Sequence, residues 1–254
     1  MQIIISCAKN MTLGEFNRDY PVSQPRFLEQ ALAHAEQMKM YSVEELMSIF
    51  KCSEEIAVLN RTRYQNFSAQ LHLCQAALSY SGVAYQHLKA DSFSLLQADY
   101  ANRHLWITSF LYGLLRPMDL IHNYRMEGTV RLPDYAGKNM FDFWKPLLTD
   151  VLINEVKADD GVLVHLATVE MERLFDWKKI RNEVKLIEPQ FYTIVSGKKK
   201  IVSVQAKMCR GAMAKYIIEN ECTDIEQLCA FSYEGYVCKG GTLTDEGFIT
   251  FMKD

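Results

Sequence analysis

The sequence contains little glycine and proline, 12 and 6 in 254 residues. Flexible linkers between domains are rich in these residues, so their scarcity favours one domain over two separate halves. Hydrophobic residues make up 49% of the chain and charged residues 23%, a composition that disordered chains do not have. We therefore predict a single folded domain spanning residues 1–254.

Membrane and disulfide signals are also missing. No apolar run approaches the roughly 20 residues that a membrane-spanning helix needs, and the first residues lack the basic and long apolar regions of a signal peptide. The seven cysteines are odd in number and scattered, without a C-x-x-C pair, which argues against a disulfide framework and a zinc ribbon. We expect a cytoplasmic protein with reduced thiols and no membrane contact.

Several common catalytic motifs are absent. The chain has no Walker A loop, no G-x-G-x-x-G, no G-x-S-x-G and no H-E-x-x-H, which disfavours an ATPase, a dehydrogenase, a serine hydrolase and a zinc protease. The histidines lack metal-ligand spacing. They are His34, His72, His87, His104, His122 and His165. We expect neither a cofactor nor a stoichiometrically bound metal.

The apolar pattern alternates between strands and helices without a regular β-α-β order. Strands are predicted at 2–6, 105–109, 162–167, 184–192, 201–205, 236–238 and 248–252. Helical spacing and capping residues predict helices that include 139–156 and 206–220, and glycine and proline predict a loop around 113–128. The pattern predicts a mixed α/β (α+β) fold with a central mixed sheet and surrounding helices.

Charge is unevenly distributed, although the formal net charge is only −3. Residues 171–220 contain eleven Lys and Arg against five Asp and Glu, a charge of +6 that leaves −9 for the rest of the chain. This asymmetry indicates a face that holds an anionic partner, whereas the small total charge argues against indiscriminate coating of nucleic acid. A solvated turn and helix face is the alternative explanation.

Residues 46–57 are predicted to form two short helices joined by a tight turn, the layout of a helix-hairpin-helix element. The second helix of such an element presents backbone N–H groups to a phosphate, and Lys51 adds positive charge in the turn. The usual form, L-x-x-L-P-G-I-G-x-x-x-A, has glycines where Lys51 and Ser53 stand here, so the backbone approaches a phosphate less freely. An ordinary corner between two helices is the alternative.

Lys207 and Arg210 lie three residues apart near the start of a predicted helix, so they share one face. The helix dipole disfavours positive charge at this end, which indicates that a bound anion or a partner carboxylate holds these side chains. Gly211 costs the helix about 1 kcal/mol relative to alanine and indicates close approach of another backbone or a ligand. A surface helix with one tight packing contact is the alternative.

Residues 104–128 contain the densest group of polar side chains, in a predicted loop after a strand, where sites on sheets tend to lie. Arg116 and Arg125 can bind an anion, and Asp119 and Glu127 can orient them or transfer protons. The same residues can equally form structural ion pairs, Arg116 with Asp119 and Arg125 with Glu127.

Six separated blocks of the chain follow, in order, the motifs of a known family. They are Ser6–Met11 against S-P-A-K-x-M, Leu59–Gln65 against L-N-x-x-R-Y/F-Q, Ser109–Asp119 against S-G-L-Y-G-L-L-R-P-L-D, Tyr124–Glu127 against Y-R-L-E-M, Leu166–Glu170 against L-A-S-x-E, and Lys207–Tyr216 against K-x-A-R-G-x-M-A-R-Y/F. The departures include Cys7 for proline, Thr168 for serine, and Cys209 and Lys215 within the last block. Over essentially its full length the chain resembles the YaaA family of bacterial peroxide-stress proteins.

The resemblance implies a cytoplasmic protein that helps cells survive hydrogen peroxide by limiting free intracellular iron and the DNA damage it causes. It also implies a mixed α/β fold with a positively charged cleft, a helix-hairpin-helix element and binding to DNA. The leading hypothesis is a DNA-binding stress protein whose phosphate contacts line a basic cleft, helped by Lys51 at the hairpin. The cleft residues are Lys9, Arg116, Arg125, Lys207 and Arg210.

The rival hypothesis is an enzyme that acts on a nucleobase or nucleotide. Lys9 would be the nucleophile or phosphate clamp, Tyr112 a donor, and a carboxylate the acid or base. The carboxylate candidates are Asp119, Glu127 and Glu170. A pocket closed around Lys9 and Glu170 would favour the enzyme, and an open groove as wide as a duplex would favour simple binding.

Iron sequestration and thiol sensing are further alternatives. The scattered cysteines and histidines give no ligand cluster for iron. Sensing through Cys7 or Cys209 would require exposed thiols, because buried cysteines do not react.

Overall fold

The computed structural model describes residues 1–12, 14–69, 73–240, 243–244 and 246–253, so His72 lies outside the described residues. Its larger sheet contains β1 (Gln2–Ser6), β3 (Leu105–Ser109), β4 (Gly113–Leu115), β6 (Val162–Leu166), β7 (Lys185–Val195), β8 (Lys198–Lys200), β9 (Ser232–Tyr233), β10 (Tyr236–Cys238) and β11 (Phe248–Lys253). Across the described residues these nine strands follow the order β4-β3-β1-β6-β7-β11-β10-β9, with β8 paired to β7. A smaller sheet pairs β2 (Cys74–Gln75) with β5 (Leu120–Ile121).

The centre of the large sheet is parallel. β1 pairs in parallel with β3 and with β6, and β7 pairs in parallel with β6 and β11. Ile3, Ile4 and Ile5 are at most 1% exposed, as expected for an apolar run in a strand covered on both faces. The mixed sheet confirms the predicted fold class, and the strands predicted at 2–6, 105–109 and 162–167 are confirmed within one residue.

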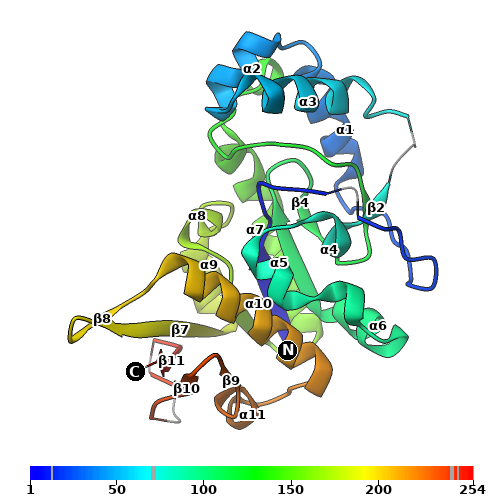
Figure 1. Cartoon of the computed structure of the whole chain (residues 1–254). Coiled ribbons are helices and arrows are strands. Elements are labelled where there is room, and N and C mark those ends of the chain that lie inside the picture. The colour runs from blue at the N-terminus through cyan, green and yellow to red at the C-terminus, as the bar shows by residue number, and fades with distance from the viewer. Residues whose placement is uncertain (13, 70–72, 241–242, 245, 254) are drawn as a thin grey trace.

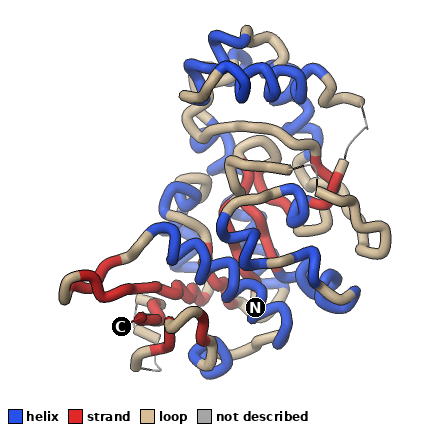
Figure 2. The backbone as a smooth tube through the Cα atoms, in the orientation of Figure 1, coloured by secondary structure: helices blue, strands red, loops and turns tan. Residues whose placement is uncertain are grey.

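Helices surround the sheet (Figure 2). They are α1 (Leu28–Met38), α2 (Val43–Phe50), α3 (Glu54–Gln65), α4 (Ala76–Ser79), α5 (Val83–Leu88), α6 (Leu95–His104), α7 (Met140–Ala158), α8 (Val169–Glu172), α9 (Trp177–Glu183), α10 (Ser203–Asn220) and α11 (Ile225–Cys229), with 3-10 turns η1 (Ala90–Ser92) and η2 (Pro133–Tyr135). α10 packs on α5 and contacts β1, β6 and β7, whereas α7 contacts β4 and β6 (Figure 1). None of the helices in the described part of the chain has the length and apolar character to cross a membrane.

The position of β1 fixes where a site can form. The chain leaves β1, adds β3 on one side, and later returns to add β6 on the other side. In open sheets of this kind, ligands bind at the carboxyl ends of the strands where the order of addition reverses. The residues that follow β1 and β6 are therefore the expected centre of a site.

Two predicted segments differ in the structure. The strand predicted at 201–205 is wrong, because β8 ends at Lys200 and helix α10 begins at Ser203. The Gln205 side chain accepts hydrogen bonds from Thr193 and Tyr236, both at 2.7 Å, so tertiary contacts override the strand propensity of Ile201 and its neighbours. The loop predicted around 113 contains β4, which pairs antiparallel with β3 and starts at a glycine with a φ of 72°.

Candidate functional site

A cavity of about 430 Å³ lies at the carboxyl ends of β1 and β6. Its walls come from segments that are distant in sequence. They include residues 5–10 at and after the end of β1, 82–85 at the start of α5, 124–127, and Lys207 and Arg210 of α10, together with Leu166, Thr168, Glu170 and Met171 at and after the end of β6. The cavity therefore occupies the place that the strand order favours.

Four of the predicted cations line this cavity together. They are Lys9, Arg125, Lys207 and Arg210, which come from the beginning, the middle and the last quarter of the chain. Glu127 and Glu170 also line it. Cations outnumber carboxylates two to one in this lining, so the cavity favours an anionic ligand.

Glu127 holds two of the four cations. Its side chain is 12% exposed and lies 2.8 Å from the Lys9 ammonium and 3.1 Å from the Arg125 guanidinium. Arg125 also donates through Nη2 to the carbonyl oxygen of Phe50 at the end of α2, at 3.3 Å. The buried Nε of Arg125 has no hydrogen-bond partner among the described residues, so the guanidinium retains a free donor.

The other two cations, Lys207 and Arg210, make no hydrogen bond or ion pair with the residues that the structure describes. Burial lowers the pKa of Arg210, and the charge of Glu172 opposes that shift. A half-buried guanidinium without a bonded acid is energetically unfavourable unless an anion joins it. This pair carries the excess positive charge of the cavity.

Gly211 explains how α10 reaches this position. A Cβ added there would lie 1.9 Å from the carbonyl oxygen of Ala84 in α5. Only glycine permits the two helices to pack this closely. The predicted close approach of another backbone at Gly211 is confirmed.

Hydrogen bonds between hydroxyl groups and backbone support the cavity lining, to which Tyr124, Ser6 and Thr168 belong. The Tyr124 hydroxyl lies 2.6 Å from Ser109 Oγ and 2.7 Å from the Tyr80 hydroxyl, and burial raises the pKa of both tyrosines. The Thr168 backbone N–H donates to Ser6 Oγ at 2.9 Å, which joins the ends of β1 and β6. These tyrosines stay protonated at neutral pH and act as structural donors and acceptors.

The two cysteines considered for sensing are poor nucleophiles. Burial raises the pKa of Cys7 to about 12, with further contributions from Glu170 and Glu127. Burial also raises the pKa of Cys209 to about 12. Because the thiolate is the reactive form, neither environment activates a thiol toward peroxide.

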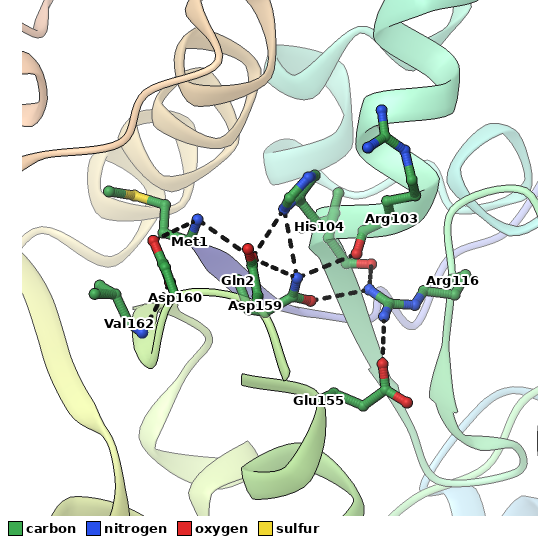
Figure 3. A network of polar contacts seen from close by, with 10 residues as sticks. Met1, Gln2, Arg103, His104, Arg116, Glu155, Asp159, Asp160 and Val162 are labelled. Atoms are coloured by element: carbon green, nitrogen blue, oxygen red, sulfur yellow. Dashed lines mark hydrogen bonds and ion pairs between the residues drawn. The ribbon is translucent and has the colours of Figure 1, made fainter. Parts of the chain in front are cut away.

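The structure places Arg116 away from the cavity, at the amino end of β1 (Figure 3). Its guanidinium bonds Gln2 Oε1 and Glu155 Oε2, both at 3.1 Å, and lies 3.3 Å from the centre of the Trp106 ring. The reason is β4, which runs antiparallel to β3 and carries the chain back to the opposite end of the sheet. Arg116 therefore does not join the other predicted cleft residues.

Three more predicted residues also lie outside the cavity lining. Asp119 is 2% exposed and accepts hydrogen bonds from Ser23 Oγ at 2.7 Å and from the Arg116 backbone N–H at 2.8 Å. Tyr112 is 1% exposed, and its hydroxyl accepts from the His122 backbone N–H. Lys51 is exposed, with a φ of 47° where α2 ends and the chain turns into α3.

Sequence spacing missed one group with metal-ligand chemistry. The ligand atoms of His165, Glu172 and Glu188 lie within 4.8 Å of one another. His165 Nε2 is already 3.1 Å from Glu172 Oε1, and the Glu188 carboxylate is bonded by Arg181. These residues come from β6, α8 and β7, so only the fold brings them together.

Comparison with known proteins gives a consistent result. The family model described as peroxide stress protein YaaA matches residues 1–240. The chain is 43% identical over 251 residues to a UPF0246 protein of Phocaeicola vulgatus, covering 98% of both chains. It is 38% identical to a UPF0246 protein of Bacteroides thetaiotaomicron, covering 99% of this chain and 98% of the relative, and 37% identical to one of Legionella pneumophila, covering 93% of both.

Proposed function

Because the chain belongs to the peroxide stress protein YaaA family, we propose that it is a cytoplasmic stress protein whose basic cavity binds phosphates of DNA. Binding would protect the DNA from iron-dependent oxidative damage. The peroxide-stress role follows from the family. The binding mode is our inference from the cavity.

The observation that carries this proposal is the pair Lys207 and Arg210. Both side chains line the cavity, and neither has an acidic partner bonded to it among the described residues. Lys9 and Arg125 lie in the same lining, oriented by Glu127. A phosphate group would satisfy the free donors and neutralise the excess charge.

The first test is a titration of a fluorescent 20-base-pair duplex at several salt concentrations. Replacing Lys207 and Arg210 together with alanine should weaken binding and lower the slope of log K against log salt by about two, one unit for each lost phosphate contact. The matched control replaces Lys138 and Lys145, two exposed cations outside the cavity lining, with alanine. An unchanged slope in the cavity variant would show that these cations do not contact phosphate.

The second test addresses protection. Plasmid DNA is exposed to ferrous iron and hydrogen peroxide with and without the protein, and strand nicking is measured. The wild-type protein should slow nicking, and the Lys207→Ala/Arg210→Ala variant should protect less at equal concentration. Equal protection by both proteins would show that protection does not depend on the cavity residues Lys207 and Arg210.

A second candidate function is an enzyme acting on a nucleobase or nucleotide. The cavity volume of about 430 Å³ falls within the range of roughly 300–1,000 Å³ typical of small-ligand sites. Lys9 and Glu170 both line it. The ion pair between Lys9 and Glu127 favours Lys9 as a phosphate clamp over a nucleophile, because a nucleophilic lysine must first lose its proton.

Deoxynucleoside monophosphates incubated with the protein distinguish this candidate. An enzyme should release free base or another product, and a Glu170→Gln variant should lose that turnover while retaining binding. Binding without turnover for any of the common nucleotides would leave the cavity as a phosphate-binding site.

A further inference from the structure

The strongly basic stretch of the sequence forms a projecting hairpin. β7 and β8 pair antiparallel, with Thr193 opposite Lys200 and Val195 opposite Lys198. Ser196 and Gly197 join them with φ values of 53° and 72°. A two-residue turn with both central residues in the left-handed region matches the natural twist of a hairpin, so β7 and β8 form a regular two-stranded ribbon here. Figure 1 shows this hairpin extending beyond the helices beside it.

The hairpin carries cations without acidic partners. Lys198, Lys199 and Lys200 are all exposed, and within the described residues none of them forms an ion pair. Lys199 lies over the ring of Tyr192, with its ammonium 3.9 Å from the ring centre. By contrast, Lys179 on the neighbouring helix α9 is bonded to Asp150 at 2.6 Å.

The two faces of the ribbon are both basic. Side chains alternate along a strand, so Lys198 and Lys200 lie on one face and Lys199 on the other. Ile194 and Val195 near the tip are each 37% exposed. Cations on both faces of a narrow ribbon complement a groove bordered by phosphates on both sides, and the DNA major groove is wide enough for a two-stranded ribbon.

We infer that this hairpin, residues 193–200, is a second nucleic-acid contact that lies in the major groove of duplex DNA; below we call it the basic arm. The inference rests on the proposed DNA binding by the cavity. α10 begins at Ser203, directly after the arm, and carries Lys207 and Arg210 into the cavity. The three paired residues on each strand of the basic arm span about 10 Å, the length of about three base pairs.

The test compares four proteins in the duplex titration described above. They are the wild type, the arm variant Lys198→Ala/Lys199→Ala/Lys200→Ala, the cavity variant Lys207→Ala/Arg210→Ala, and the control Arg131→Ala/Lys138→Ala/Lys145→Ala, which removes equal charge from exposed positions elsewhere. The arm variant should bind more weakly and lower the salt slope by two to three units, and the control should resemble the wild type. Circular dichroism and thermal unfolding check that the exposed substitutions leave the fold intact.

Groove occupancy is tested with two modified duplexes. One contains bulky glucosylated cytosines that fill the major groove, and the other is saturated with the minor-groove ligand netropsin. The difference between wild type and arm variant should disappear on the first duplex and persist on the second. A difference that persists on the filled major groove would overturn the groove assignment.

The outcomes separate the arm from the cavity. If the wild type and cavity variant differ while the arm variant matches the wild type, the arm inference is wrong and the proposed function stands. If the arm variant and the control weaken binding equally, the effect is general charge and the inference is also wrong. If the wild type does not bind duplex DNA, the proposed function is wrong and the arm inference falls with it.

Discussion

Replacing Gly211 with alanine tests the packing that brings α10 to the cavity. The added Cβ would lie 1.9 Å from the Ala84 carbonyl oxygen, 2.7 Å from its carbonyl carbon and 3.0 Å from its Cα. Real Cβ contacts essentially never fall below 3.0 Å, so α5 and α10 must separate by about 1 Å, against the tight packing of protein interiors. The obstacle is backbone, which cannot rotate away as a flexible side chain can.

The net effect combines two opposing contributions. Alanine gains about 1 kcal/mol of helix propensity over glycine, whereas overpacking costs typically 1–3 kcal/mol and more when backbone must move. We expect the free energy of unfolding to fall by about 1–2 kcal/mol, which lowers Tm by about 2–4 °C per kcal/mol for a chain of this size. Because Ala84 also lines the cavity, affinity for phosphate should fall as well.

Chemical denaturation and a thermal melt measure this change. The control is Gly137→Ala, where no atom lies within 4 Å of the added Cβ but φ is +79°. That variant should lose stability only through backbone strain, about 1–2 kcal/mol, and should bind phosphate as the wild type does. A Gly211→Ala protein that is more stable than the wild type would refute the close packing of α5 and α10.

Three other results are expected. Glu127→Gln removes the carboxylate that holds Lys9 and Arg125, so DNA affinity should rise several-fold at low salt in the duplex titration; weaker binding would mean that orientation matters more than charge. Burial lowers the pKa of His34 from 6.5 to about 4. The contribution of the neutral His34 to the free energy of unfolding, about 3 kcal/mol, is therefore fully present above pH 6.5 and is lost as the pH falls toward 4. Chemical denaturation across this pH range should show the loss, and a His34→Gln protein should not show it. Cys7, with a pKa raised to about 12, should react slowly with iodoacetamide at pH 8 in the folded protein, and rapid labelling detected by mass spectrometry would contradict the raised pKa.

Local sequence patterns correctly predicted the elements whose residue types directly reflect their burial in the fold. The apolar run Ile3–Ile5 identified the central strand, because a strand buried on both faces needs no alternation. The helical spacing of 206–220 identified most of α10 (Ser203–Asn220). The segment after Lys200 was misassigned because its β-branched residues favour a strand, while contacts made by Gln205 favour the start of a helix.

The candidate site was predictable only in part. The positions of Lys207 and Arg210 on one helix face were visible in their spacing, and both line the cavity. Arg116 and Arg125 were grouped because they are close in sequence. The short return strand β4 puts Arg116 beside Gln2, at the opposite end of β1 from the cavity. A three-residue strand gives too little periodicity to be recognised, so this separation depends on tertiary structure.

The clamping of Arg125 has a thermodynamic consequence for any ligand of the cavity. The residue is fixed at both ends, since Tyr64 donates to its carbonyl oxygen at 2.6 Å while its guanidinium bonds Phe50 and Glu127. A free arginine loses up to about 2 kcal/mol of rotamer entropy when it is immobilised. Here folding has already ordered the side chain, so a phosphate that bonds it loses little of its affinity to that ordering, whereas the exposed Lys207 must still be immobilised when the ligand arrives.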